Sequence, residues 1–179
     1  MRIIDAILRV FQAISAIIVL GISVDLARGQ DTRLQSVPPA TRYAAFCGGF
    51  GTLVSSIGII SLFISSLEGL ITFVLDALSG VAMLASGIAY AVLLRHTDCS
   101  NVYYSEATWR NELLSGGCVT VGNGIGCRYG GREEEGKLKS RCVSAKADTA
   151  FMFISFVACV GIVGYSFFAR GKGKGVSYA

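Results

Sequence analysis

The amino-acid sequence predicts an all-α membrane protein, a bundle of four transmembrane helices with a disulfide-bonded loop between the third and the fourth. Three observations support this prediction. Of the 179 residues, 53% are apolar and only 16% are charged. Four long apolar stretches divide the chain, and four of the six cysteines fall in one polar connection. Soluble domains carry about a quarter charged residues, so this composition argues against a soluble enzyme. The high apolar content excludes a disordered chain, and the net charge of only +4 argues against a basic nucleic-acid module.

Each apolar stretch is long enough to cross a bilayer as a helix. The stretches cover residues 3–27, 43–67, 69–94 and 147–169. A transmembrane helix needs about 20 apolar residues, because the hydrocarbon core is about 30 Å thick and each residue rises about 1.5 Å. Within lipid every backbone N–H and C=O must be paired inside its own segment, so these stretches are predicted to be helices. We expect one transmembrane domain over residues 1–169 and a short basic tail at 170–179.

The first stretch has the length of a signal peptide, but its charges favour a retained helix. Asp5 and Arg9 interrupt its start, and Asp25 spoils a small-residue cleavage pattern at Ala27.

The three connections differ in kind. Pro38-Pro39 stops the first helix from continuing. Leu67-Glu68-Gly69 alone joins the second stretch to the third, which predicts a tight hairpin. The connection at 95–146 is the one sizeable polar region, and we expect it to form the cysteine loop.

Four cysteines lie in that loop: Cys99, Cys118, Cys127 and Cys142. An even set in a short extramembrane segment indicates two disulfides, which persist on the oxidising side of a membrane. Zinc binding is the alternative, but the loop has no C-x-x-C pair, so we expect no metal. Three connectivities are open. We favour the nested one, Cys99–Cys142 with Cys118–Cys127, because the outer bond would join the exit of the third helix to the entry of the fourth.

The orientation of the chain is predicted by two signals that disagree. The first and third connections carry eleven Lys and Arg residues, whereas the two ends carry four. The positive-inside rule therefore places the large loop in the cytosol, although the rule weakens as loops lengthen. Cysteine usage places the same loop outside. We expect both termini to be cytosolic and the cysteine loop to be extracellular.

Arg9 and Asp76 are the charged residues placed deepest in the spans. Each lies about two turns from its end of the bundle, so the two are at comparable depth. An unpaired charge in hydrocarbon is expensive, and such residues usually face the bundle and find a partner. The functional interpretation is a buried ion pair. In the alternative, Arg9 snorkels to headgroups and Asp76 bonds a serine or is protonated.

Small residues are frequent in the spans. Such residues let helix backbones approach closely, and we interpret most of them as packing positions inside the bundle. The remainder are candidates for an oligomer face or for a groove that holds a sterol or sphingolipid tail. The glycines chosen as packing positions are Gly48, Gly51, Gly80, Gly87, Gly161 and Gly164.

A family resemblance extends over nearly the whole chain. Asp76, the run Arg95-His96-Thr97-Asp98-Cys99-Ser100-Asn101-Val102-Tyr103, and Arg141-Cys142 followed by Ala147 and Ala150-Phe151-Met152-Phe153 carry it. With these residues the chain resembles the fungal non-classical export protein 2 family, which are four-helix MARVEL-domain proteins. The resemblance implies a plasma-membrane protein that organises eisosome-associated domains and responds to sphingolipid. The loop is longer than that family's, and Cys118 and Cys127 lie in the extra segment.

The expected function is that of a non-enzymatic membrane organiser without a cofactor. Its expected partners are membrane lipids, copies of itself or other membrane proteins, and not nucleic acid. A transporter or channel is the second hypothesis, but it would need a polar path or internal repeats. A membrane thiol oxidoreductase is the third, but that chemistry usually uses a C-x-x-C pair.

Overall fold

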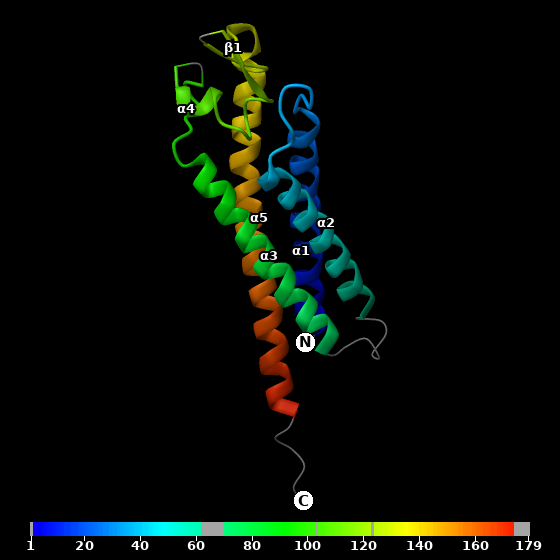
Figure 1. The fold of residues 1–179 in the computed structure, drawn as a ribbon. Coiled ribbons are helices and arrows are strands. Elements are labelled where there is room, and N and C mark those ends of the chain that lie inside the picture. The colour runs from blue at the N-terminus through cyan, green and yellow to red at the C-terminus, as the bar shows by residue number, and fades with distance from the viewer. Residues whose placement is uncertain (1, 62–69, 103, 123, 174–179) are drawn as a thin grey trace, which may run out of the picture.

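The computed structural model describes residues 2–61, 70–102, 104–122 and 124–173. Four long helices run side by side, and a small polar cap sits on one end of them (Figure 1). The helices are α1 (Arg2–Arg28), α2 (Pro39–Ser61), α3 (Leu70–Leu94) and α5 (Glu135–Gly173). The cap contains α4 (Glu106–Trp109), β1 (Cys118–Val121), β2 (Gly124–Cys127) and the 3-10 turn η2 (Arg132–Glu134).

The predicted four-helix membrane architecture is confirmed. All four helices are long and apolar enough to cross a membrane. The helix α2 begins at Pro39, four residues before the predicted stretch, because proline is well suited to the first turn of a helix. The predicted hairpin Leu67-Glu68-Gly69 lies outside the described residues, as does the tail from residue 174 onward.

The fourth helix differs most from the sequence expectation. It begins at Glu135, twelve residues before the predicted stretch, so part of the expected loop is helical. Its extra turns carry one buried face, made by Leu138, Cys142 and Ala145 at spacings of four and three residues. Hydropathy identifies only the apolar part of such a helix. The charged outer face of the extension lowers its mean hydropathy, so the extension does not stand out as part of the helix.

The helices pack in a ring in which α1 and α3 each lie between α2 and α5. Glycines permit the closest approaches. A Cβ atom on Gly48 would lie 2.6 Å from the backbone nitrogen of Leu20, and one on Gly80 would lie 3.0 Å from the Cβ of Cys159. The α1–α2 and α3–α5 contacts therefore depend on the absence of a side chain.

The outside of the bundle is apolar and much of its interior is polar. Charged and hydroxyl side chains such as Arg9, Asp76, Ser23 and Asp148 are buried. Large apolar side chains are exposed on every long helix instead, among them Ile14 and Ile17 on α1, Phe46 and Leu53 on α2, Leu78 and Val81 on α3, and Val157 and Val160 on α5. This arrangement suits a protein surrounded by lipid, because lipid tails solvate apolar side chains and polar groups must find partners inside.

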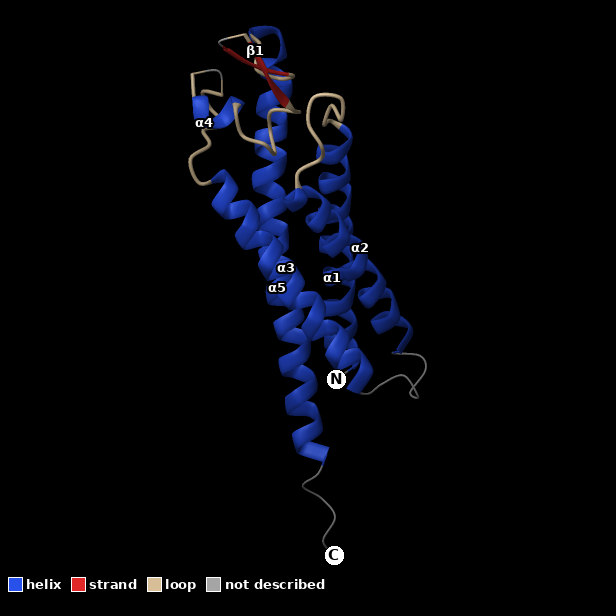
Figure 2. Cartoon of the chain, viewed as in Figure 1, coloured by secondary structure: helices blue, strands red, loops and turns tan. Residues whose placement is uncertain are grey.

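The cap is built from the long connection before α5. Strands β1 and β2 form an antiparallel hairpin in which Cys118 pairs with Cys127 (Figure 2). Gly122 adopts a φ of 59° at the turn between them, a conformation that favours glycine.

Candidate functional site

The Arg9 side chain lies at the centre of a cluster that we call the charged node, made of Asp5, Arg9, Gly58 and Asp76. The Nη1 atom of Arg9 lies 3.3 Å from Oδ2 of Asp76, so the pair joins α1 and α3, which lie diagonally opposite in the ring of helices. The Nε atom of Arg9 lies 3.4 Å from Oδ1 of Asp5, one turn earlier on α1. The structure thus brings Arg9 and Asp76 together, with Asp5 as a second acid.

Burial and close packing characterise the centre of the charged node. Arg9 is 4% exposed and Asp76 is 1% exposed, so neither side chain extends to the membrane surface. Gly58 of α2 provides the space for the guanidinium, because a Cβ atom at that position would overlap Nη1 of Arg9. In the sequence, Gly58 is one of many small residues in the spans, and only the helix packing reveals that it faces Arg9.

Gln12 extends the polar contacts toward α5. Its Nε2 atom donates to Sγ of Cys159 over 3.1 Å, and both side chains are buried. Cys159 and Cys47 are both buried and unbridged.

A second polar cluster lies at the opposite end of the bundle, beneath the cap. We call it the hydroxyl node, and it consists of Ser23, Thr41, Tyr90 and Asp148, one from each long helix. The Oγ atom of Ser23 donates to Oδ2 of Asp148 over 2.7 Å. All four residues are buried, and the Tyr90 hydroxyl lies near the other three. The Tyr90 hydroxyl and the Oδ1 atom of Asp148 have no hydrogen-bond partner among the described residues.

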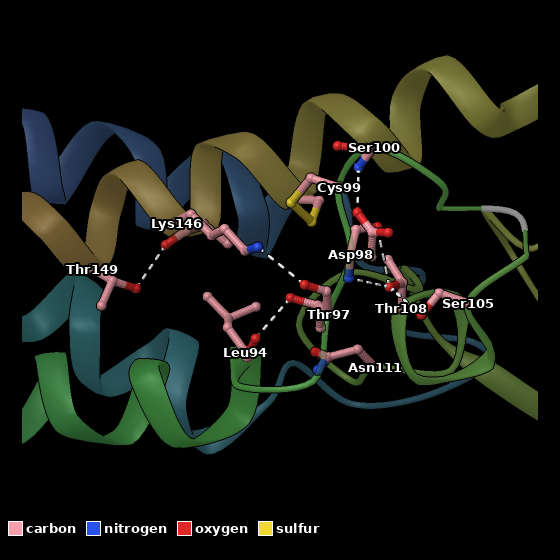
Figure 3. Close-up of a disulfide and its surroundings, with 12 residues drawn as sticks. Leu94, Thr97, Asp98, Cys99, Ser100, Ser105, Thr108, Asn111, Lys146 and Thr149 are labelled. Atoms are coloured by element: carbon pink, nitrogen blue, oxygen red, sulfur yellow. Dashed lines mark hydrogen bonds between the residues drawn. A yellow bond between two sulfur atoms is a disulfide. The ribbon is translucent and has the colours of Figure 1, made fainter.

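Two disulfides stabilise the cap, and one of them attaches it to the bundle. Cys99–Cys142 joins the segment after α3 to the extension of α5, with 5.6 Å between the Cα atoms. Cys118–Cys127 closes the hairpin. This is the nested connectivity favoured from the sequence. Beside the outer bond, the Lys146 amine donates to the Thr97 carbonyl over 3.0 Å (Figure 3).

Arg141 joins the cap to the bundle through three buried hydrogen bonds, a role that its place in a charged stretch of the sequence does not predict. Its guanidinium donates to the carbonyls of Leu26, Leu113 and Leu114 at 3.0–3.1 Å. Leu26 belongs to the last turn of α1, where unpaired carbonyls give the helix end a partial negative charge. Arg141 therefore joins α1, the cap and α5 in one contact.

The six predicted packing glycines fall into two groups. A Cβ atom on Gly48, Gly51, Gly80 or Gly87 would lie within 3.4 Å of a neighbouring helix. A Cβ atom on Gly161 or Gly164 would meet nothing within 4 Å. The expectation of packing inside the bundle is therefore wrong for Gly161 and Gly164, because no neighbouring helix packs directly against these two positions of α5.

Gly161 borders an apolar groove between α1 and α5. The groove has a volume of about 450 Å³ and is lined by Leu8, Phe11, Phe153, Ile154, Val157, Ala158 and Gly161. It opens on the lipid-facing side, where Phe11, Val157 and Gly161 are exposed. The groove is accessible to a lipid chain or to an apolar side chain of a neighbouring membrane protein.

No catalytic arrangement emerges from these contacts. Among the residues that the structure describes, no group of His, Cys, Asp and Glu side chains is placed to hold a metal ion. The deep polar residues contact one another, and the loop cysteines are bonded in pairs.

Comparison with known proteins gives one match. Residues 2–165 match the family model of the MARVEL membrane-associating domain. No curated protein and no solved structure matches the chain. The matched region contains all of α1, α2 and α3, both polar nodes and the cap. A four-helix membrane bundle that matches the family model over nearly its whole length belongs to the MARVEL family of membrane-associating domains.

Proposed function

We propose that the protein is a non-enzymatic organiser of membrane domains, which associates laterally with copies of itself or with other membrane proteins and contacts lipids. The observation that supports this function best is the distribution of polarity across the bundle. The polar side chains of the two nodes are turned inward, where Arg9 pairs with Asp76 and Ser23 with Asp148, while all four helices present apolar side chains outward. Such a molecule can act through its lipid-facing surface.

The groove between α1 and α5 is the lateral contact site in this proposal. The open space over Gly161 and Gly164 would let a helix of a second copy approach closely, as small residues do at membrane helix interfaces. We propose a homo-oligomer that uses this side of α5.

The finer parts of the proposal concern place and sidedness. The two disulfides favour a cap on the oxidising side, which leaves both termini in the cytosol. The resemblance to the fungal non-classical export protein 2 family supports a location in eisosome-associated domains of the plasma membrane and a response to sphingolipid.

Energy transfer between labelled copies in vesicles tests the lateral contact. The variant Gly161→Leu/Gly164→Leu fills the open side of α5 and should lower the transfer at each dilution with lipid. Gly21→Leu is the matched control, because Gly21 lies on the exposed side of α1 with nothing within 4 Å. Equal transfer in all three proteins would reject the contact site.

Solute flux through the same vesicles separates an organiser from a transporter. We expect no flux above that of empty vesicles. Protein-dependent flux of an ion or small solute would favour the transport function, which requires a polar path through the bundle.

A further inference from the structure

Four exposed cations surround the bundle at the end that carries the cap. They are Arg28 at the end of α1, Arg42 in the first turn of α2, Arg95 directly after α3, and Lys146 on α5. We call them the belt cations. Three of the long helices carry one each, and the fourth, α3, ends directly before Arg95, so the positive charge is distributed around the bundle.

The belt cations lie at similar depth relative to the hydroxyl node. Arg28 and Arg95 each lie five residues beyond the node residue of their helix, about 7.5 Å along the helix axis. Arg42 and Lys146 lie one and two residues from theirs, within about 3 Å. The four therefore fall in a band about 9 Å thick. The headgroup region of each leaflet is about 5–8 Å thick, and these long side chains extend toward it.

Lipid-facing apolar side chains adjoin the band on the side of the membrane centre. Tyr43 and Phe46 follow Arg42 on α2, and Ile88 and Val92 precede Arg95 on α3, all exposed. The belt cations thus lie where the exposed surface changes from apolar to polar, which is the position of lipid headgroups.

The belt cations differ from the cations of the cap in their partners. Arg110 and Arg128 of the cap pair with Glu106 and Asp31, and Lys137 in the first turn of α5 pairs with Glu134. Within the described ranges, no carboxylate lies within ion-pair distance of a belt cation; the one polar contact is the bond from Lys146 to the Thr97 carbonyl.

Two exposed acidic residues, Asp25 and Asp98, lie close in sequence to the belt cations Arg28 and Arg95. Both acids also interact with other groups. Asp98 accepts a 2.8 Å hydrogen bond from the Ser100 backbone N–H and one of 3.4 Å from the Asn101 side chain. It also interacts electrostatically with Lys146. Asp25 interacts electrostatically with the buried Arg141. The two acids offset the belt only in part, and the belt keeps an excess of positive charge.

We propose that the belt cations bind the phosphodiester headgroups of anionic lipids in the leaflet on the cap side. The phosphodiester is the recognised group, since Lys and Arg donate to its oxygens and attract its charge. A zwitterionic headgroup brings its own cation and gains less from the belt. This inference rests on the proposed function in lipid contact and names the lipid class.

The test compares two variants that lose the same number of charges. The belt variant is Arg28→Gln/Arg42→Gln/Arg95→Gln, which leaves Lys146 in place for its bond to Thr97. The control is Arg110→Gln/Arg128→Gln/Lys137→Gln, which removes three paired cap cations. Each protein is titrated with phosphatidylglycerol and with phosphatidylcholine in neutral micelles, and bound lipids are counted by native mass spectrometry.

We expect the unmodified protein and the control to retain phosphatidylglycerol in preference to phosphatidylcholine. The belt variant should bind phosphatidylglycerol at least roughly tenfold more weakly, because each cation near an anionic surface contributes about fivefold. Phosphatidylcholine binding should stay the same in all three proteins.

Two outcomes overturn the inference. Equal preference for phosphatidylglycerol in all three proteins would show that the belt does not bind it, and equal losses in both variants would show that net charge alone is responsible. Energy transfer between labelled copies, measured on the same variants, keeps the two proposals separate. If energy transfer is unchanged and phosphatidylglycerol is not preferred, the inference about the belt cations is rejected. The proposed function as an organiser is then retained.

Discussion

Each polar node stabilises a buried carboxyl group, but the partner of that group differs between the two nodes. In the charged node, the buried carboxylate of Asp76 lies beside the guanidinium of Arg9 at 3.3 Å. In the hydroxyl node, the buried carboxyl of Asp148 has Ser23 as its hydrogen-bond donor at 2.7 Å and lies within ion-pair distance of no cation among the described residues. Both acids are almost fully buried, so the partner and not the burial distinguishes them.

This difference shows what each carboxyl requires. A buried charge with a counter-charge is stable only while both partners are present, so removing either partner is costly. A buried carboxyl held by a hydroxyl group depends on hydrogen bonds, and a neutral amide of the same shape can replace it. The charged node should therefore be sensitive to charge changes, and the hydroxyl node should tolerate them.

Arg9→Leu should have the largest effect. It leaves Asp5 and Asp76 without their cation in an apolar environment, and the expected loss in free energy of unfolding is about 3–5 kcal/mol. Unfolding in mixed micelles with increasing denaturing detergent measures it. A loss below about 1 kcal/mol would show that the ion pair does not distinguish the nodes.

Removing the outer disulfide should affect the hydroxyl node and not the charged node. The bond closes a segment of 43 residues, and the paired variant Cys99→Ala/Cys142→Ala should lose about 2–4 kcal/mol. Hydrogen exchange should rise around Tyr90, beneath the cap, and stay unchanged around Asp76. Equal increases at both ends would mean that the nodes do not differ in their dependence on the cap.

The coupling between Arg9 and Asp76 is measured by a double-mutant cycle. Asp76→Asn and Arg9→Gln should each destabilise the bundle, and the double variant should lose less than their sum by about 1–3 kcal/mol. The interaction energy is the difference that the same detergent titration yields. Fully additive losses would mean that Arg9 gains its stability from Asp5 alone.

Asp148→Asn should have the smallest effect. The amide oxygen can still accept the hydrogen bond from Ser23, and no described cation loses an ion-pair partner, so stability should change by less than about 1 kcal/mol. The titration used for Arg9→Leu provides the direct comparison. A loss as large as that of Arg9→Leu would reveal that Asp148 carries a paired charge.

Much of the architecture could be predicted from the sequence. The four spans follow from local hydropathy, since a membrane requires long apolar segments with internally satisfied backbones. The pairing of Arg9 with Asp76 was proposed from their equal depth, and the structure brings the two side chains together. The nested disulfides were favoured because consecutive helices place Cys99 near Cys142.

Contacts that depend on helix rotation could not be predicted. Gly58 faces Arg9, and Gly161 and Gly164 face away from the other helices, although all three are small residues in apolar helices. The rotation of each helix about its axis decides these positions, and it follows from the packing of all four helices together.

The sequence by itself determined that the chain crosses the membrane four times, that its charges within the spans are few, and that its cysteines gather in one loop. Hydropathy and composition are properties of the residues along the chain, so they can be determined without a structure. The tertiary structure alone decided that Ser23, Thr41, Tyr90 and Asp148 meet, and that Arg141 reaches three carbonyls. Such contacts join distant segments, and they arise because buried polar groups must find partners wherever packing brings them together.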